Sequence, residues 1–410
     1  MRLLLFSLLI LFSACQPSER PSPTQSRLTE IPRLLDRPES TRHGQEWDQV
    51  QNRYTQYRDQ ILSEKEADKA LLQLAQLFTV EARVTGEHGH YYPAALQTLD
   101  ALLDSAPDDR DLTFLALTTK AGVLLSQHQF AAALETGKEA LEMNPYNAQI
   151  YGVLVDAQVE LGHYEKAVEL ADQMVAIRPD LRSYARVSYL REIHGLVDPA
   201  IEAMQLAVSA GLPGTEEAAW TRLQLGQLYE RYGQPQKAEA HFLHVLTERP
   251  AYPFALGALG KLELERGDYA KAEKWLTQAA EAIPELSFYE DLVRLYQATG
   301  RNAEAEKTLN AVLLMLQDDV ASGHQMNLEF ARVCAELMHD DRRALEYLLR
   351  EYDQRPDNID VNRELAGLYT RMGQTGEAQF HLRKAARTNS RHPELVSLQS
   401  EMGVDRLSAN

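Results

Sequence analysis

Apolar and small residues recur along most of this chain with two superimposed periods. The short period is that of an amphipathic helix, and residues 219–250 show it clearly, with apolar or small side chains at Leu225, Gly226, Tyr229, Ala238, Phe242 and Val245. The long period is close to 34, because Pro145 and Pro179 lie 34 residues apart and so do Pro250 and Pro284. Proline disfavours the helical conformation in the residue before it, so each long period is predicted to hold helices that end near the proline.

The smallest side chains occupy matching places in successive periods. The first half of the period carries Gly226, Gly260 and Ala366, and the second half carries Ala238, Ala272 and Ala378. Two helices can approach closely only where the facing side chains are this small. We therefore interpret each period as a pair of packed helices, which predicts an elongated repeat protein.

These residues and their spacing resemble the tetratricopeptide-repeat family over about residues 76–393. Copies of the pattern cover 114–147, 148–180, 181–214, 219–250, a copy ending at Pro284, 286–319, 325–358 and 359–390, with a degenerate copy at 76–107. The resemblance implies an all-α, right-handed superhelical solenoid of about eight to nine helix-turn-helix repeats. It also implies a concave groove that binds another protein or peptide. Short insertions after Gly214 and Val320 are expected to bend or break the superhelix.

The chain is predicted to divide into five segments. A signal peptide is expected at 1–14, and a disordered tether rich in proline and serine at 15–45. Packed structure is expected to begin near Glu46, with a capping helix and the degenerate repeat in 46–113. The solenoid then covers 114–392, and 393–410 form a polar capping helix and tail.

The first residues have the composition of an export signal. Arg2 precedes an apolar run from Leu3 to Phe12, and Ser13-Ala14-Cys15 follow. A run of about ten residues is too short to cross a bilayer, which needs about 20. Cysteine directly after small residues resembles a bacterial lipoprotein signal, which implies that Cys15 carries the lipid. The expected location is the bacterial cell envelope, with the outer membrane favoured over the inner one and the solenoid in the periplasm or at the cell surface.

Charge and cysteine content narrow the function. The formal net charge is −18, from 42 Lys+Arg against 60 Asp+Glu, which argues against a nucleic-acid partner. Only Cys15 and Cys334 are present, so a lipidated Cys15 leaves Cys334 alone, in a helix where a buried packing role is expected. The chain has no Gly-rich phosphate loop, Gly-x-Ser-x-Gly elbow or His-Glu-x-x-His pair. We predict a non-enzymatic adaptor without a cofactor.

By the family resemblance, the first helix of each copy lines the groove. The candidate partner-binding residues there are Asp156, Arg182, Arg186, Tyr189, Trp220, Gln227, Arg231 and Lys261. The stretch 182–191 is unusual, because three arginines and two tyrosines occur in an otherwise acidic chain. Arginine and tyrosine are enriched at interaction hot spots, so this stretch is the favoured contact.

Two other functions remain open. A solute- or glycan-binding lipoprotein of an outer-membrane import system also uses such repeats, but with long insertions that these nearly contiguous copies lack. A metal-handling accessory protein would use His88 and His90, which flank Gly89 in a segment expected to be the turn of the degenerate repeat. We interpret that turn as a packing element, with the two histidines as weak metal candidates.

Overall fold

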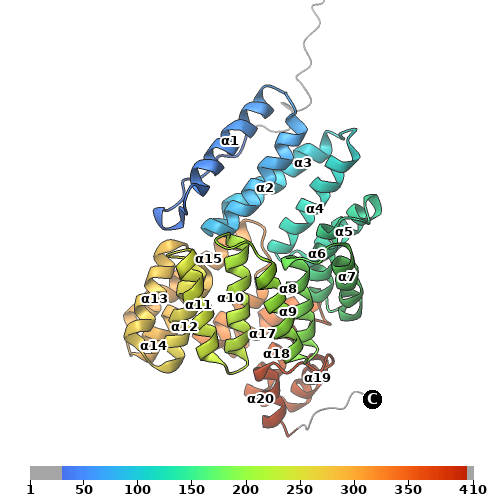
Figure 1. Cartoon of the computed structure of the whole chain (residues 1–410). Coiled ribbons are helices and arrows are strands. Elements are labelled where there is room, and N and C mark those ends of the chain that lie inside the picture. Colours follow the sequence, from blue (N-terminus) through green and yellow to red (C-terminus); the bar gives the residue numbers. More distant parts are fainter. Residues whose placement is uncertain (1–29, 404–410) are drawn as a thin grey trace, which may run out of the picture.

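The computed structural model describes residues 30–403, and every regular element in this range is a helix (Figure 1). A short 3-10 helix, Glu39–Thr41, comes before the first α-helix. A first helix, α1 (Glu46–Leu62), precedes nine helix pairs. The pairs are α2 (Ala67–Thr85) and α3 (His88–Asp104), α4 (Arg110–Ser126) and α5 (Phe130–Met143), α6 (Ala148–Glu160) and α7 (Tyr164–Ile177), α8 (Leu181–Ile193) and α9 (Val197–Ala210), α10 (Glu216–Arg231) and α11 (Pro235–Glu248), α12 (Pro253–Arg266) and α13 (Tyr269–Ala282), α14 (Leu286–Ala298) and α15 (Asn302–Ala321), α16 (Asn327–Arg332) and α17 (Asp341–Gln354), and α18 (Ile359–Arg371) and α19 (Thr375–Ala385). Helix α16 continues as a π-helical turn over Val333–Leu337, and α20 (Pro393–Glu401) follows the last pair.

The all-α solenoid predicted from the repeats is confirmed, and its small residues lie where the helices of a pair cross. A β-carbon added at Gly260 of α12 would lie 2.6 Å from Cγ of Leu276 in α13, which is far too close for non-bonded carbon atoms. The alanines of the second helices, such as Ala238 and Ala272, are fully buried. The repeat therefore forms because each pair can bury its apolar face only against a close neighbour.

The superhelix coils tightly enough for one turn to contact the next. Hydrogen bonds join residues that are 194 to 198 positions apart, a distance of nearly six repeats of about 34 residues. The backbone N–H of Ile359 donates to the hydroxyl of Tyr164 (2.8 Å), and Asn358 Nδ2 donates to the carbonyl of Glu160 (3.0 Å). The helices near the C-terminus accordingly lie beside α6 to α9 (Figure 1). We call this contact between 127–195 and 322–391 the inter-turn seam.

Two glycines allow the backbones to meet at this seam. Gly162 lies in the turn between α6 and α7, and Gly195 lies in the turn between α8 and α9. Their φ angles of +81° and +74° correspond to a backbone conformation that favours glycine. A β-carbon at Gly162 would overlap the carbonyl of Asp357, and one at Gly195 would overlap the carbonyl of Asn389. The guanidinium of Arg387 completes the contact by donating to the carbonyls of Gly162 and Asp357.

The insertion after Val320 strengthens the superhelix, where the sequence suggested a bend or break. Helix α15 runs on to Ala321, and the loop after it reaches the turn between α4 and α5. There Gln127 Nε2 donates to the carbonyl of Ser322 (3.1 Å), and the N–H of Gln325 donates to the carbonyl of Gln127 (3.0 Å). The inserted residues therefore belong to the inter-turn seam.

The predicted tether is wrong for its second half, because residues 30–45 pack against the folded chain. Arg37 is 3% exposed, and its Nε and Nη2 donate to Glu81 of α2 at 2.7 and 2.5 Å. The N–H of Leu35 donates to the hydroxyl of the buried Tyr91 (3.0 Å). Ile31, Leu34 and Leu35 cover the apolar cluster of α2 and α3. Proline and serine content suggested disorder, but these apolar side chains and one buried ion pair hold the segment in place. We call residues 30–45 the strap.

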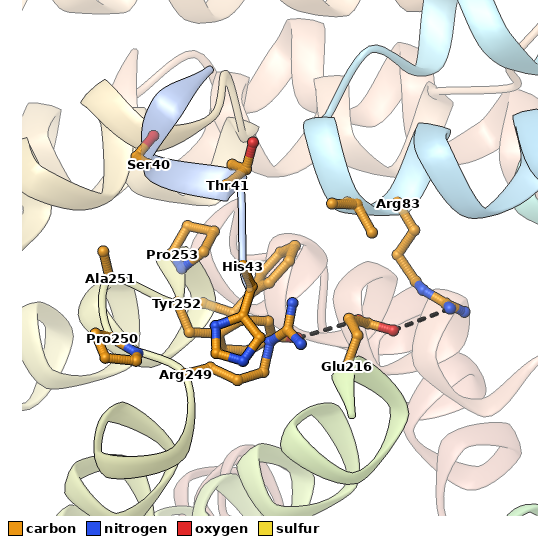
Figure 2. A pocket seen from close by; sticks show the side chains of 12 residues that line it. Ser40, Thr41, His43, Arg83, Glu216, Arg249, Pro250, Ala251, Tyr252 and Pro253 are labelled. Atoms are coloured by element: carbon orange, nitrogen blue, oxygen red, sulfur yellow. Dashed lines mark hydrogen bonds and ion pairs between the residues drawn. The ribbon is translucent and has the colours of Figure 1, made fainter. Parts of the chain in front are cut away.

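The strap also joins the start of the chain to its middle. Figure 2 shows Thr41 and His43 of the strap beside the loop between α11 and α12, which contains Arg249, Pro250 and Tyr252. Arg249, 5% exposed, donates to both carboxylate oxygens of Glu46 at 2.7 and 3.1 Å. The cavity enclosed here is only about 30 Å³, enough for little more than water. The ion pair therefore fixes the C-terminal end of the strap, where α1 begins at Glu46, to the middle of the chain.

A helix packs on the solenoid at each end of the described chain. Helix α1 buries Trp47 and Ile61 and packs its partly buried Tyr54 and Tyr57 on the apolar cluster of α2 and α3. Helix α20 buries Leu395 against α18 and α19. Cys334 is fully buried and burial raises the pKa of its thiol, in keeping with the expected packing role. Between Glu30 and Gly403, no helix combines the length and the apolar character needed to cross a membrane.

Candidate functional site

A groove on the first helices α6, α8 and α10 gathers six of the eight predicted partner-binding residues. Its volume is about 450 Å³, in the range of small-ligand and side-chain pockets. The six are Asp156, Arg182, Arg186, Tyr189, Trp220 and Arg231. We call this cavity the Trp220 groove. Tyr189 and Trp220 keep 38% and 37% of their surface exposed, so both offer aromatic area to a partner.

The arginines of the Trp220 groove are each paired with a carboxylate, so the cationic stretch seen in the sequence is neutralised locally. Arg186 donates to both oxygens of Asp156 at 2.9 and 2.6 Å, and Arg182 donates to Glu217 at 2.5 Å. The hydrogen bond from Glu217 raises the pKa of Arg182. Arg231 donates to Glu192 at 2.5 Å. Burial opposes the charge of Arg231, but Glu192 outweighs it and raises the pKa of that guanidinium.

Four arginines and four carboxylates line the Trp220 groove, so its formal charge is zero. The remaining pair is Arg83 of α2 with Glu216, 2.9 Å apart (Figure 2). Paired side chains of both signs can re-pair with a partner's polar groups without leaving a buried charge alone. The groove is thus suited to a polypeptide with mixed polar and apolar side chains. A ligand that carries charge of one sign only would not be attracted to it, because the charges of the groove cancel.

An aromatic row extends from the groove into the next repeats. Trp220, Phe254 and Phe288 follow at intervals of 34 residues, and their rings meet edge-to-face with centroids 5.2 and 5.9 Å apart. Phe288 is 4% exposed, so the row is open to solvent at Trp220 and closed at Phe288. Sequence reasoning placed Trp220 in the groove, and the 34-residue interval could have added Phe254 and Phe288.

The other two predicted groove residues lie outside this cavity. Lys261 of α12 is exposed and pairs with Glu230 (2.7 Å) and Glu265 (3.5 Å). Gln227 is half-buried on α10 and does not line the Trp220 groove. The family pattern indicates which face of each helix lines the groove. It gives no information on the curvature of the superhelix, and that curvature decides which residues share a cavity.

His88 and His90 do not lie in a turn. The turn of the first pair is Gly86-Glu87, and His88 begins α3. The two rings serve different contacts, because His90 Nε2 donates to the carbonyl of Arg33 in the strap (2.9 Å) while His88 stacks on Tyr92 (centroids 5.4 Å apart). Burial lowers the pKa of His88 to about 4. Within residues 30–403, no three His, Cys, Asp or Glu side chains are arranged to hold a metal ion.

Two further cavities follow the Trp220 groove in a row, each sharing lining residues with the one before it, and sequence reasoning missed both. The first, the Glu160 cavity, has a volume of about 430 Å³ and shares Asp156 with the groove. The second, the His324 cavity, has a volume of about 470 Å³ and shares Ser126, His128 and Glu329 with the Glu160 cavity. Both lie between the two superhelical turns, so no window of adjacent repeats reveals them.

Parts of this chain are similar to known proteins and to family models. The solved structure of the APC/C hetero-tetramer Cut9-Hcn1 is similar over 84% of this chain and 68% of that chain, with 15% identity and a TM-score of 0.47. Residues 124–191 and 223–286 each match a family model described as tetratricopeptide repeat. By these two matches the chain contains tetratricopeptide repeats, a type that forms protein-interaction scaffolds.

Two curated proteins share part of their sequence with this chain. The Vi polysaccharide export protein VexE of Salmonella typhi is 29% identical over 169 residues, which are 39% of this chain and 24% of that protein. Tetratricopeptide repeat protein 21B of Xenopus laevis is 22% identical over 292 residues, which are 63% of this chain and 21% of that protein. The chain spans less than a quarter of the length of either relative.

Proposed function

We propose that this protein is a non-enzymatic scaffold of the bacterial cell envelope that holds a polypeptide segment in the Trp220 groove. The observation that carries the proposal is the groove itself, where exposed Tyr189 and Trp220 lie among paired arginines and carboxylates on three successive repeats. Tetratricopeptide repeats are generally non-catalytic interaction modules, which supports a binding function. The adjoining Glu160 and His324 cavities extend the binding surface.

The envelope location is proposed from the sequence. Cys15 and the predicted signal peptide 1–14 lie outside the described residues, and the apolar run followed by Ser13-Ala14-Cys15 supports lipidation. The partial similarity to a bacterial export protein fits an envelope role. Glu30, the first described residue of the strap, lies 15 positions after Cys15, so the two residues cannot be farther apart than about 50 Å. The strap would then hold the solenoid near the membrane.

Replacing Trp220 with alanine is expected to weaken recovery of the bound partner by about tenfold or more. Aromatic anchors at interfaces often contribute about 2 kcal/mol or more, and this ring is both exposed and supported by Phe254. The measurement is quantitative co-purification from solubilised membranes with the full-length lipidated protein. Tyr146→Ala is the matched control, because Tyr146 is an aromatic residue with 84% of its surface exposed away from the groove. Equal recovery from both variants would contradict the proposed groove.

Changing Cys15 to alanine is expected to release the protein from membranes while leaving the solenoid folded. Several acyl chains on one cysteine anchor stably, whereas a folded domain with a net charge of −18 has little affinity for anionic lipid. The measurement is membrane fractionation together with labelling by a fatty-acid probe, and circular dichroism checks the fold. Cys334→Ala serves as the control, because that buried thiol should take no label. A Cys15 variant that still sediments with membranes would overturn the anchor.

A metal-handling or solute-import role has less support. The two histidines proposed for metal make separate contacts, one to the strap and one to Tyr92. The insertion after Val320 is short and makes hydrogen bonds across the inter-turn seam. Neither feature favours a second function over the scaffold.

A further inference from the structure

The His324 cavity has a composition that differs sharply from that of the Trp220 groove. Five carboxylates line it, namely Glu87, Glu285, Asp318, Asp319 and Glu329. Four histidines also line it, namely His88, His90, His128 and His324. No lysine or arginine of the described chain takes part in the lining. A concave surface with charges of one sign concentrates the electrostatic field and attracts the opposite charge.

Two buried acceptor atoms in this lining lack a partner. His324 is 7% exposed, and its Nδ1 lies 3.2 Å from the carbonyl of Asp319. The hydroxyl of Ser322 also lies 3.1 Å from Nδ1, but it donates its own proton to the same carbonyl (2.8 Å). Both oxygens therefore accept from Nδ1, so Nδ1 carries the proton and Nε2 presents a lone pair. This Nε2 is buried without a hydrogen bond, and so is Oε2 of Glu329. Buried acceptors are normally satisfied, so both atoms require a donor from outside the chain.

An aromatic surface stands beside these acceptors. The rings of His88 and Tyr92 stack, and the ring of His324 lies 5.6 Å from Tyr92 and 6.3 Å from His88 between centroids. Burial lowers the pKa of His88 to about 4, so the ring is neutral at physiological pH and does not repel a cation. A planar cation can stack on such rings while donating to carboxylates at its edge.

We propose that the His324 cavity recognises the guanidinium group of an arginine side chain on the polypeptide held by the scaffold. The cavity supplies carboxylates for the charge, two unsatisfied acceptors for N–H donors and an aromatic face for the plane. Its volume of about 470 Å³ accommodates one such side chain with the adjoining backbone. A metal ion would need a tight ligand set, and the described residues contain no group of that geometry. This proposal rests on the proposed scaffold function and names the chemistry of its partner.

The test uses acetyl-arginine methylamide as the probe and acetyl-citrulline methylamide as its uncharged counterpart. Binding to the full-length protein is measured by ligand-detected NMR titration. We expect the arginine probe to bind about tenfold or more tightly than the citrulline probe, since a charge-assisted hydrogen bond exceeds a neutral one. Equal binding of the two probes, or no binding of the arginine probe, would overturn the proposal.

A double variant locates the binding. Asp319→Asn with Glu285→Gln should weaken arginine binding by about tenfold or more, because it removes two negative charges from the cavity. The fold should tolerate both amides, since burial already raises the pKa of both carboxyl groups and so disfavours their charged forms. The control is Glu165→Gln with Glu202→Gln, which removes the same charge at exposed positions on α7 and α9. The proposal fails if the cavity variant and the control bind the probe equally.

Acidification provides an independent readout with a defined sign. Burial raises the pKa of Asp319 to about 6, so this carboxylate is progressively neutralised as the pH falls from 7.5 to 5.5. The other titratable groups that line the cavity are Asp318 on the same helix, Glu87, His88 and His90 on the α3 side, His128 after α4, Glu285 before α14, and His324 and Glu329 around α16. Any histidine that gains a proton adds repulsion, so arginine binding should weaken at pH 5.5. Stronger binding there would overturn the proposal.

Failure of this proposal can be separated from failure of the scaffold. Trp220 does not line the His324 cavity, so Trp220→Ala should bind the arginine probe as the parent does. Loss of partner recovery in Trp220→Ala with no arginine binding in the parent would retain the scaffold and remove only the arginine pocket.

Discussion

Replacing Arg355 with methionine is expected to lower the free energy of unfolding by about 3–5 kcal/mol, because it removes the cation from a buried ion-pair network. Arg355 is 5% exposed and donates from Nε to Glu351 and from Nη1 to Glu160 across the inter-turn seam. Its guanidinium also lies 4.8 Å from the centre of the Phe130 ring. Methionine keeps the apolar contact but leaves two carboxylates without their partner. The measurement is urea unfolding followed by circular dichroism.

Arg342→Met is the matched control for this experiment. The side chain of Arg342 is 91% exposed and its nearest carboxylate, Glu346, is 4.0 Å away, so the change should alter the free energy of unfolding by no more than about 0.5 kcal/mol. Adding Glu160→Gln and Glu351→Gln to Arg355→Met should recover much of the loss, since no buried charge would then be unpaired. Failure of these amides to recover stability would show that the cost arises from packing and not from charge.

The pH dependence of the same variant has a definite sign. Burial raises the pKa of Glu160 even with Arg355 present, and removing the arginine raises it further. When the folded pKa exceeds the unfolded one, the folded state binds more protons between the two values, so its stability decreases as the pH rises through that window. The deficit of Arg355→Met relative to the parent should therefore be larger at pH 8 than at pH 5. An equal deficit at both pH values would contradict this account of Glu160.

The sequence predicts the helix pairs well because their determinants are local. Gly260 and Ala272 mark a crossing within one repeat, and the proline spacing marks its end, so short windows contain the information. The face of α8 and α10 that forms the Trp220 groove follows from the same periodicity. Six of the eight proposed groove residues consequently meet in one cavity.

The parts that the sequence did not predict depend on contacts between distant segments. Arg355 and Glu160 are 195 residues apart, and Arg37 and Glu81 are separated by 44. Nothing in the local sequence distinguishes Arg355, which follows the last residue of α17, from an exposed arginine at the end of another helix. The strap has the composition of a disordered tether for a related reason. Its proline content predicts disorder, and the burial of its three apolar residues depends on α2 and α3, which the local sequence does not contain. Pairing of the groove arginines likewise depends on neighbouring repeats.

Replacing Gly162 with alanine is expected to open the inter-turn seam while leaving the helix pairs intact. The β-carbon would overlap the backbone carbonyl of Asp357, and a backbone group cannot move aside as a flexible side chain could. The left-handed conformation of Gly162 (φ +81°) adds about 1–2 kcal/mol for a residue with a β-carbon. The overlap should add about 1–3 kcal/mol to this cost. The measurements are the free energy of unfolding and the radius of gyration from small-angle X-ray scattering.

Gly233→Ala separates the two contributions. Gly233 occupies the equivalent turn between α10 and α11 with φ of +73°, and a β-carbon added there would have no atom within 4 Å. It therefore carries the conformational cost alone, and its radius of gyration should equal that of the parent. Gly195→Ala, which meets the carbonyl of Asn389 at the same seam, should behave as Gly162→Ala does. Because each solenoid repeat otherwise leans only on its neighbours, an opened seam should keep its helical circular dichroism while the coil expands. Equal stability and equal size for the Gly162 and Gly233 variants would mean that the seam does not hold the superhelical turns together.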